Sequence, residues 1–470
     1  MPETPTAPLW TADEIARATG GRLRGETFVV DGVAFDSREI EPGKLFVALK
    51  GVRDGHEFAK GAFEAGAAGA LVERPVEGGP FVEVGDTLRA LEALGEAARV
   101  RAPARRAAVT GSVGKTSVTQ AIKAGLDLAG RAHASVKSYN NHIGVPLTLA
   151  RMPRDTERAV FEIGMNAPGE IGPLSKMVRP HVACVTTVGP VHIEAFADGE
   201  AGVAREKAAI FEGLEPRGIA VINGDNPWMR LLADVAWEHG AEVRLFGSAA
   251  DHGARLLDFQ PDAEGATVSA VVEGQALEFR LRQSGCHWGL NSLAVLTVLR
   301  AMDVSLDTAL EALAGFAPLA GRGQVRQIRR AGGGAFTLID ESYNANPLSM
   351  TAGFRSLGAR TLPEGGRRVV FLTDMLELGH QAEAMHAGLA GPLADGGIDV
   401  VHTAGPMMRH LHEALPAGRR GEWRETAAVM AGEVDVLVRD GDLVMVKGSN
   451  GSRAGLIAAA LAALNSDDGA

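Results

Sequence analysis

A glycine-rich loop between a buried strand and a helix is the feature that most constrains how this chain can fold. Its residues are Gly111, Ser112, Val113, Gly114, Lys115, Thr116 and Ser117. The apolar run at 107–109 predicts a strand before the loop, and the helical pattern after it ends at Gly130. Glycines allow backbone N–H groups to approach an anion, and the start of a helix adds positive potential. The loop therefore predicts a phosphate site in which Lys115 reaches the terminal phosphates and Thr116 holds Mg²⁺.

The loop is shorter than the usual phosphate-binding pattern. Val109 stands at the position where that pattern has its first glycine. A glycine-rich turn that carries a stray lysine is the alternative interpretation. Because the flanking strand and helix both stand in register with the loop, the sequence favours phosphate binding over the plain turn.

Composition limits the class of protein. A chain of 470 residues with 46% hydrophobic residues is expected to form about two or three globular domains. A net charge of −11 argues against general binding to nucleic acids or anionic membranes. Cys184 and Cys286 cannot build a disulfide framework, the N-terminus lacks a secretory signal pattern, and the longest apolar run, near 456–464, is too short to span a bilayer. We expect a cytoplasmic protein without a membrane span, and a monomer because the sequence suggests no extended apolar interface.

The first domain, residues 1–103, is expected to be a small α/β unit. Thr11 with Glu14 three residues later predicts a helix start. Strands are expected at 28–30, 33–35, 45–49, 70–72 and 81–84, and helices at 56–65 and 87–100. Ser37 and Arg38 lie on a loop between strands, where a hydroxyl and a guanidinium suit a diphosphate or a nucleotide edge. The local signal alone favours a solvated turn there.

Four arginines surround Pro103 at the end of this domain. They are Arg99, Arg101, Arg105 and Arg106. We interpret the stretch as a linker between domains and expect its arginines to be solvated.

The central domain, residues 104–317, places polar residues where predicted strands end. The strand at 159–164 carries Glu162 near its end, and a carboxylate there in a parallel sheet faces the nucleotide and can hold Mg²⁺. His192 follows the strand at 182–189, and both a metal ligand and a structural histidine stay open for it. Residues 241–282 are expected to be rich in strands, with apolar and polar residues alternating at 266–272 and 277–281.

Four further positions in the central domain carry weaker local signals. Asn140 and Asn141 precede a glycine and a proline, and a plain turn is the favoured interpretation. Lys207 lies on a helix predicted around 200–212, where the local context indicates a solvated cation. Asn291 shares a face with His287 if the next helix already runs there.

The third domain, residues 318–470, is expected to be a Rossmann-like, doubly wound parallel sheet. Strands are predicted at 336–340, 369–373, 400–403 and 443–447, with helices at 381–393 and 426–437. The glycine pattern of dinucleotide-binding folds is missing from the sequence. Lys447 and Ser449 at a strand end predict either a carboxylate or phosphate contact or a helix-entry turn. The tail at 466–470 is expected to be disordered.

Six motifs occur in one order along the chain and resemble those of the Mur ligase family, ATP-dependent ligases that build the stem peptide of peptidoglycan. They are Gly111-x-x-Gly114-Lys115-Thr116, Asn140-Asn141-x-x-Gly144-x-Pro146, Glu162-x-Gly164, His192-x-Glu194, Lys207 and His287-x-x-x-Asn291. The run from Asp340 to Pro347 resembles the branch that adds D-alanyl-D-alanine (D-Ala-D-Ala) to UDP-N-acetylmuramoyl-tripeptide (UDP-MurNAc-tripeptide). The resemblance covers nearly the whole chain, and several motifs in one order are more specific than any single motif.

The resemblance implies a role for each matching position. Residues 111–117 would bind ATP, Asn291 would contact adenine, Asp340 the ribose and Arg322 the phosphates. Two Mg²⁺ ions would be held by Thr116, Glu162, His192 and Lys207. Lys207 would act as a carbamate, an anion, which reverses its interpretation as a solvated cation. Lys115, Lys207, His192 and Glu162 would form the catalytic set. Substrate contacts would come from Ser37 and Arg38 (UDP), from Asn140 and Asn141 (muramoyl peptide), and from Asn344, Asn346, Lys447 and Ser449.

The chain departs from the family pattern at four positions. Thr187 and Trp288 stand where asparagine is common, Ala209 where an acidic residue is common, and Thr373 where glycine is common. These departures bear on adenine contacts and loop shape, and they leave the implied metal ligands and phosphate contacts in place.

Other functions stay open on the sequence alone. A related ligase would add a diamino acid to the dipeptide or glutamate to folate, which the run at 340–347 disfavours. A non-catalytic ATP-dependent module would not need Lys115, Glu162, His192 and Lys207 together. A P-loop NTPase that couples hydrolysis to movement would need no amine as acceptor.

Overall fold

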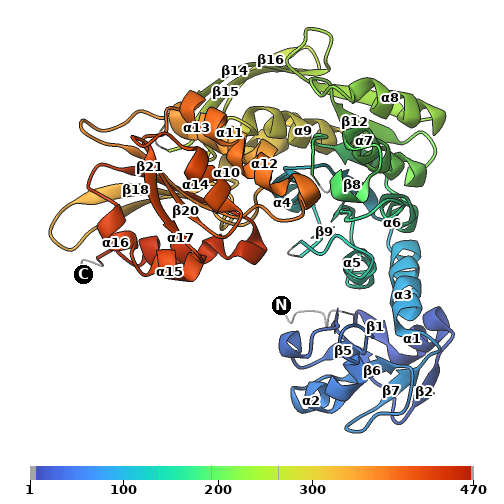
Figure 1. The fold of residues 1–470 in the computed structure, drawn as a ribbon. Coiled ribbons are helices and arrows are strands. Elements are labelled where there is room, and N and C mark those ends of the chain that lie inside the picture. The colour runs from blue at the N-terminus through green and yellow to red at the C-terminus, as the bar shows by residue number, and fades with distance from the viewer. Residues whose placement is uncertain (1–6, 137, 192, 263, 467–470) are drawn as a thin grey trace.

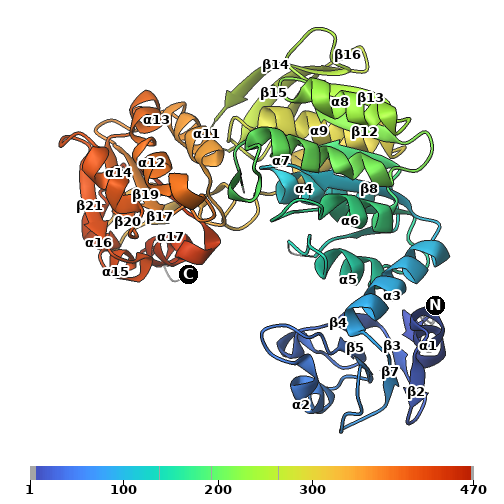
Figure 2. The same ribbon diagram turned by 45° about the vertical axis from the view of Figure 1, so that its right-hand side comes forward.

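The computed structural model describes residues 7–136, 138–191, 193–262 and 264–466 and arranges them in three α/β domains. Each domain is built around its own sheet. Figures 1 and 2 show three lobes, with the N-terminal and the C-terminal lobe each beside the central one. The fold class predicted from the sequence is confirmed. Among the described residues, no helix is both long and apolar enough to cross a lipid bilayer.

The N-terminal lobe contains a five-stranded sheet of mostly parallel strands. In spatial order these are β2 (Arg22–Arg24), β7 (Phe81–Glu83), β6 (Gly69–Val72), β5 (Lys44–Val47) and β4 (Gly32–Ala34), with the short pair β1 (Trp10–Thr11) and β3 (Val29–Val30) beside them. The helices are α1 (Ala12–Thr19), α2 (Ala59–Glu64) and α3 (Thr87–Arg101). Thr11 and Glu14 form the predicted capping box at the start of α1.

The central lobe is organised by a nine-stranded sheet. In spatial order its strands are β16 (Gln275–Leu281), β15 (Ala266–Val272), β14 (Ala254–Pro261), β13 (Glu242–Gly247), β12 (Ile219–Asn223), β11 (Val182–Val185), β8 (Arg105–Thr110), β10 (Arg158–Glu162) and β9 (Ala132–Ala134). The strands from β13 to β9 are parallel, while β14, β15 and β16 form an antiparallel extension.

Helices cover both faces of the central sheet. One apolar core lies under α4 (Lys115–Ala129), α9 (Trp288–Ala301) and α10 (Leu306–Gly315). The other lies under α5 (Gly144–Ala150), α6 (Ile171–Val178), α7 (Glu200–Ala208) and α8 (Met229–Glu238). Because parallel strands all end at the same edge, this arrangement places the loop after β8 beside the ends of β10 and β11.

The C-terminal lobe is a six-stranded sheet with helices on both faces. Its spatial order is β17 (Gln324–Arg329), β18 (Ala335–Glu341), β22 (Leu443–Lys447), β19 (Arg368–Thr373), β20 (Val400–Ala404) and β21 (Arg420–Arg424), and only the edge strand β17 is antiparallel within this part of the structure. The helices are α11 (Pro347–Gly358), α12 (Ala382–Ala387), α13 (Ala390–Asp395), α14 (Met408–Ala414), α15 (Ala427–Ala431), α16 (Val434–Leu437) and α17 (Ala454–Ala462).

Two long helices predicted for this lobe are each broken into two. The helix expected at 381–393 is divided into α12 and α13, and Gly388 caps the first piece. The helix expected at 426–437 is divided into α15 and α16, and Gly432 caps α15. Both glycines keep right-handed helical backbone angles, and the breaks follow from the low helix propensity of glycine, whose backbone loses more conformational freedom in a helix than that of other residues.

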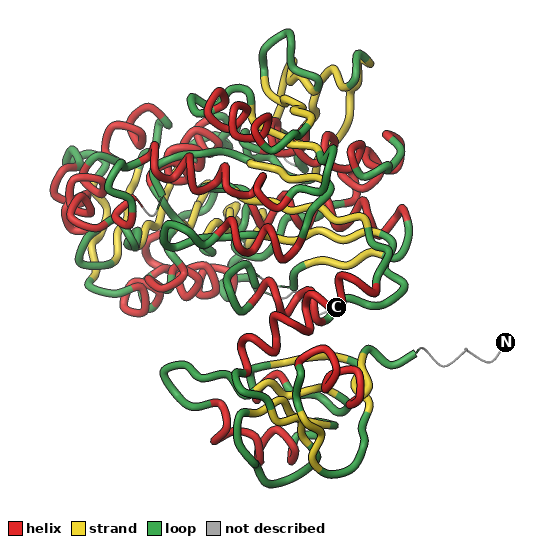
Figure 3. Tube along the Cα trace, turned by 90° about the vertical axis from the view of Figure 1, so that its right-hand side faces the viewer, coloured by secondary structure: helices red, strands yellow, loops and turns green. Residues whose placement is uncertain are grey.

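The interpretation of residues 99–106 as a solvated linker is wrong. Helix α3 continues to Arg101 and joins the two lobes (Figure 3), packing against α5. The Arg101 guanidinium lies 3.5 Å from the centre of the Trp10 ring, and Nη1 donates to Leu9 O at 2.7 Å. Arg106 is buried and donates to the carbonyls of Ala104 and Val178. Burial lowers the pKa of both arginines to about 10.

Candidate active site

A cleft of about 430 Å³ between the central and C-terminal domains collects most of the polar residues that the sequence singled out. The central domain contributes the glycine-rich loop before α4, together with Asn140, Asn141, Glu162, His287 and Asn291. The C-terminal domain contributes Arg322, Glu341, Tyr343, Asn344, Asn346 and Lys447.

The glycine-rich loop has a shape that only glycine allows at its first position. Gly111 has a φ of +153°, and a Cβ on it would lie 1.9 Å from Thr186 Oγ1. The next residue anchors the loop, because Ser112 N–H donates to Thr187 O at 2.8 Å and its Oγ donates to Gly189 O at 3.0 Å. The loop is therefore pressed against the segment that follows β11, with α4 beginning at Lys115.

Lys115 is turned back onto its own loop. Its Nζ donates to Gly111 O at 2.7 Å. Enclosure in the cleft lowers the pKa of Lys115; attraction from Glu162 opposes this, and repulsion from Arg322 adds to it. Charged groups of both domains thus act on the lysine that the sequence predicts as a phosphate ligand.

Four side chains form a closed ring across the cleft. Arg322 Nη2 donates to Thr116 Oγ1 at 3.1 Å, and Thr116 Oγ1 lies 3.3 Å from Ser138 Oγ. Ser138 Oγ lies 3.0 Å from the hydroxyl of Tyr343, and the Arg322 guanidinium lies 4.0 Å from the centre of the Tyr343 ring. Because Arg322 and Tyr343 belong to the C-terminal domain, the ring bridges the two domains at the hydroxyl predicted to hold Mg²⁺.

Glu162 ends strand β10 and is 1% exposed. Its Oε1 accepts a hydrogen bond from Asn140 Nδ2 at 2.6 Å, and its Oε2 is buried without a hydrogen-bond partner among the described residues. Asn141 is used differently, since its Oδ1 accepts from the N–H groups of Ile143 and Gly144 just before α5. Asn140 thus holds the carboxylate, and Asn141 shapes the turn.

Lys207 is 2% exposed, so its interpretation as a solvated cation from the local sequence is wrong. Helix α7 packs against α6 and α8, which removes the lysine from water. Burial, then repulsion from Lys115, lowers the pKa of Lys207 well below its usual value, and Glu206 opposes the shift. The neighbouring Glu206 is occupied in capping α6, because its carboxylate accepts from Gly169 N–H at 2.7 Å and Ile171 N–H at 2.8 Å.

The far part of the cleft holds a second charged cluster. Lys447 at the end of β22 pairs with Glu341 at the end of β18, with Nζ and Oε2 3.1 Å apart. Burial alone would raise the pKa of Glu341, but Lys447 and His287 together hold it below its ordinary value. Asn291 lies beside the glycine-rich loop, since its Oδ1 would be 3.3 Å from a Cβ on Gly114.

Several predicted residues of the C-terminal domain support local structure. Asn346 caps α11, since its Oδ1 accepts from Ser349 N–H at 2.9 Å. Ser449 Oγ accepts from Leu376 N–H and donates to Ala345 O. Asp340 Oδ1 accepts from Ser342 N–H at 3.0 Å. Asn346 lines the cleft, whereas Ser449 and Asp340 are not among the described residues that line it.

Ser37 and Arg38 lie outside this cleft, on a short 3₁₀ turn of the N-terminal lobe (Ser37–Glu39). Arg38 is largely exposed and pairs with Asp36, with Nη2 and Oδ2 2.6 Å apart, which raises the pKa of Arg38. The turn faces the central lobe, because the Tyr139 hydroxyl donates to the Glu39 carboxylate at 3.1 Å. His192, predicted as a metal ligand, lies outside the described residues.

Sequence reasoning missed three residues that the cleft brings together. Tyr343 stands inside the motif run at 340–347, so its position was visible although its partners were not. Glu341 lies in the same run, whereas Ser138 carried no local signal, and both act through contacts more than 100 residues away in sequence.

Comparison with known proteins gives matches along most of the chain. Three family models match, described as "Mur ligase family, catalytic domain" over 29–108, "Mur ligase middle domain" over 109–299 and "Mur ligase, glutamate ligase domain" over 321–450. The UDP-N-acetylmuramoyl-tripeptide--D-alanyl-D-alanine ligase of Bacillus subtilis is 32% identical over 94% of this chain and 95% of its own length. The chain belongs to the Mur ligase family.

Other similar proteins agree with this Mur ligase assignment. The Escherichia coli ligase of the same name is 33% identical over 93% of this chain and 95% of its own. A crystal structure of MurF from Acinetobacter baumannii aligns with a TM-score of 0.86 at 26% identity, covering 98% of this chain and all of that one. The three-lobed architecture of this Mur ligase is thus that of a solved relative.

Proposed function

We propose that this Mur ligase joins D-Ala-D-Ala to UDP-MurNAc-tripeptide through an amide bond, at the expense of ATP, in the cytoplasmic stage of peptidoglycan synthesis. The observation that carries the proposal is the interdomain cleft, where Lys115 and Thr116 of the glycine-rich loop face Arg322 and Tyr343 of the C-terminal domain. The named relatives, which align over almost their whole length, support the choice of substrates.

ATP would bind with its phosphates on residues 111–117. Backbone N–H groups at the start of α4 would receive the phosphates, and Lys115 would leave Gly111 O to meet the terminal one. Arg322 would turn from Thr116 to the phosphates as a second cation. Asn291, which lies beside Gly114, would contact the adenine, and Asp340 would contact the ribose.

The residues present fit Mg²⁺, for which a carboxylate and a hydroxyl combined with nucleotide phosphates are a common donor set. Glu162 has an unpartnered, buried Oε2, and Thr116 offers its Oγ1 in the same cleft. We assign one ion to Thr116 and a second to Glu162, His192 and Lys207. Bound Mg²⁺ would neutralise charge that develops on the phosphates.

Lys207 is proposed to carry a carbamate. Its buried position lowers the pKa of the amine, and an unprotonated amine can add to CO₂, which yields a carbamate and releases a proton. The product is an anion that could join Glu162 as a metal ligand. A carbamate carbon signal from ¹³CO₂ that disappears in the Lys207→Arg variant would support this; an identical spectrum in the two proteins would contradict it.

The proposed ligation proceeds through two nucleophilic substitution steps. The terminal carboxylate of the tripeptide attacks the γ-phosphorus of ATP, which forms an acyl phosphate and releases ADP. The free amine of D-Ala-D-Ala then attacks the acyl carbon, loses a proton, and inorganic phosphate leaves from the tetrahedral intermediate. Lys115 and Arg322 stabilise the accumulating negative charge, and the bridged domains exclude water that would hydrolyse the acyl phosphate.

Each domain is proposed to serve one substrate. Residues 1–103 would bind the UDP moiety through Ser37 and Arg38, residues 104–317 ATP, and residues 318–470 the dipeptide. Asn140 and Asn141 line the cleft and would contact the muramoyl peptide. Asn344 and Lys447 line the cleft in the C-terminal domain, and Asn346 and Ser449 position the loops around them.

The test is phosphate release from ATP with both substrates present or one omitted, together with the mass of the product. We expect release to require both substrates and the product to gain the mass of one dipeptide. Lys115→Met should abolish release, while Lys123→Met, on the exposed side of the same helix, should leave it unchanged. Release that ignores both substrates would indicate a P-loop NTPase, and release that answers to another amino acid would overturn the assigned dipeptide.

A further inference from the structure

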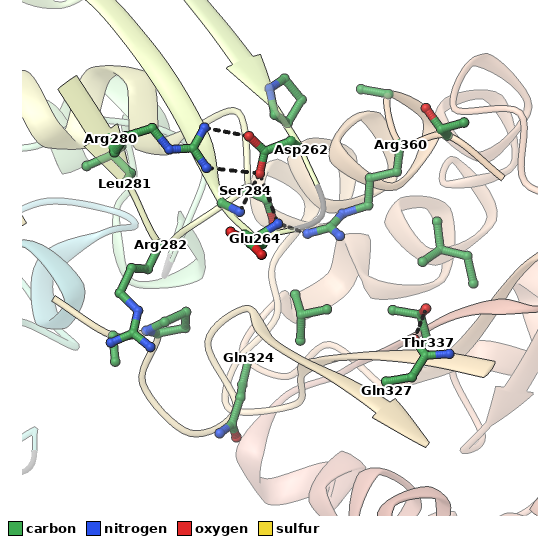
Figure 4. Close-up of a pocket in the computed structure, with 18 of the residues that line it drawn as sticks. Asp262, Glu264, Arg280, Leu281, Arg282, Ser284, Gln324, Gln327, Thr337 and Arg360 are labelled. Atoms are coloured by element: carbon green, nitrogen blue, oxygen red, sulfur yellow. Dashed lines mark hydrogen bonds and ion pairs between the residues drawn. The ribbon is translucent and has the colours of Figure 1, made fainter. Parts of the chain in front are cut away.

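A second cavity, of about 830 Å³, lies between the antiparallel extension of the central domain and the C-terminal domain. Figure 4 shows its charged residues. The central domain contributes residues around β16, among them Arg280, Arg282 and Ser284, and the C-terminal domain contributes Gln324, Thr337 and Arg360. Its volume falls within the range of small-molecule sites in proteins.

The lining combines excess positive charge with apolar surface. Three arginines face two carboxylates, those of Asp262 and Glu264. One arginine is neutralised, because Arg280 binds Asp262 through both Nη atoms. In Figure 4 no interaction joins Arg282 to the other side chains drawn. The remaining wall is largely proline, alanine and aliphatic residues: Pro261, Leu281, Ala314, Ala317, Pro318, Val325, Ala359 and Leu443.

Arg360 is the residue of this cavity with unmet bonding capacity. Its guanidinium contacts Ser284 Oγ through Nη2, while its Nε is buried without a hydrogen-bond partner in the described part of the chain. Burial lowers the pKa of Arg360, and Asp262 and Glu341 only partly oppose the shift. The Nε is closed off from solvent, so an anion in the cavity would meet Arg360 through the part of the guanidinium that lines the cavity, where the positive charge favours an anionic acceptor.

The cavity and the active-site cleft share their walls. Helix α11 begins beside the active-site cleft at Asn346 and ends just before Arg360, and its 12 residues span about 18 Å. On the central side, Arg282 and Ser284 precede His287 and Asn291 of the active-site cleft by only a few residues. A rotation of the C-terminal domain about the segment between α10 and β17 must therefore alter both openings.

We propose that this cavity is a second binding site, for a small molecule that carries one carboxylate or phosphate group on an apolar body. The anion lies against Arg360, Arg282 adds a second positive charge farther along the lining (Figure 4), and the apolar body lies against the proline and aliphatic wall. Because the lining comes from both domains, the ligand fixes the angle between the domains and thereby changes the affinity of the active-site cleft for nucleotide.

Binding is tested by calorimetric titration with benzoate and phenyl phosphate, which separate carboxylate from phosphate recognition. We expect saturable binding of at least one probe, weakened about ten-fold by Arg360→Gln and by Arg282→Gln. Arg409→Gln, an exposed arginine of α14, is the matched control and should bind as the unaltered protein does. Lys115→Ala should also retain binding, because it alters only the phosphate loop.

Coupling is tested by titrating ADP with and without the bound probe. The proposal predicts a several-fold change in ADP affinity that vanishes in Arg360→Gln. Probe binding that is lost in Lys115→Ala but retained in both cavity variants would place the anion on the phosphate loop and overturn the site. The failure of both probes to bind would also overturn the site. An ADP affinity that ignores the bound probe would refute the coupling. None of these readouts depends on the ligation reaction.

Discussion

Thr116 and Thr119 are both on α4, and their hydroxyls have opposite environments. Thr116 Oγ1 accepts from Arg322 and lies beside Ser138, whereas Thr119 Oγ1 is buried with no partner in the described structure. We predict that Thr116→Val lowers kcat/KM for ATP at least about ten-fold and raises the Mg²⁺ concentration required. Thr119→Val should leave activity unchanged and the free energy of unfolding equal or slightly higher, since no hydrogen bond is lost.

Kinetics at varied Mg²⁺ and urea unfolding check this pair of variants. The same loss of activity in both would mean that the effect reflects packing of α4. Full activity in Thr116→Val would remove this hydroxyl from the metal site.

Two buried histidines predict how stability depends on pH. Burial lowers the pKa of His402 and of His133 to about 4 each. Since the folded pKa lies below the unfolded value of 6.5, the unfolded chain binds more protons between these values. Stability is therefore complete above pH 6.5 and falls as the pH drops toward 4, by about 1 kcal/mol per pH unit for each histidine.

Substitution of His402 isolates one contribution. His402 stacks on Phe371 and accepts from Glu422 N–H, so His402→Gln should lower stability at pH 7. It should also flatten the decline between pH 6.5 and 4, which urea unfolding at several pH values measures. The exposed His239→Gln should keep the decline of the unaltered protein; an equally steep decline in His402→Gln would contradict the assignment.

At the scale of elements, helix α3 carries the junction between the first two lobes. Arg101, near its end, stacks on Trp10 and donates to Leu9 O, while Arg89 on the same helix has an exposed side chain. We predict that Arg101→Leu lowers the free energy of unfolding by about 1–3 kcal/mol through the lost stacking and the unpaired carbonyl. Arg89→Leu should change it by less than about 0.5 kcal/mol. Equal urea midpoints for the two variants would show that the stacking contributes nothing.

Local patterns predicted most elements because their signals are local. The strands before the glycine-rich loop and around Glu162, the capping box at Thr11 and the helix after Lys115 all follow from spacing and turn chemistry. The breaks at Gly388 and Gly432 could have been inferred from the glycines themselves. The contacts of the half-buried Arg101 and the buried Arg106 could not, because Arg101 meets Trp10 and Arg106 meets Val178 only through the tertiary fold.

The candidate site was predictable as a set of residues and not as an arrangement. Lys115, Thr116, Glu162 and Asn140 were named from motifs, and they line one cleft. The hydrogen bond from Asn140 to Glu162 and the ring through Ser138 and Tyr343 depend on which strand ends and loops meet. Periodicity along the chain carries no information about which strand ends and loops lie side by side in the fold.

At the scale of the molecule, the ring across the cleft holds the C-terminal domain against the central one. We predict that Arg322→Gln, which adds no cleavage site for thermolysin, increases several-fold the rate at which this protease cuts the segment between α10 and β17, because the bridge to Thr116 is lost. Arg326→Gln, at an exposed arginine on β17, is the control and should be cut at the original rate. Equal cutting of both variants would indicate that the ring does not restrain the domains.

The central claim is that the chain forms an amide through an acyl phosphate. The most direct measurement labels the terminal carboxylate of UDP-MurNAc-tripeptide with ¹⁸O and follows the label during turnover with ATP and D-Ala-D-Ala. Transfer of the γ-phosphoryl group to that carboxylate predicts one ¹⁸O in each molecule of released phosphate, with the other retained in the new amide. Phosphate that carries no ¹⁸O while ATP is consumed would show that water, rather than the peptide carboxylate, attacks the nucleotide, and would contradict the claim.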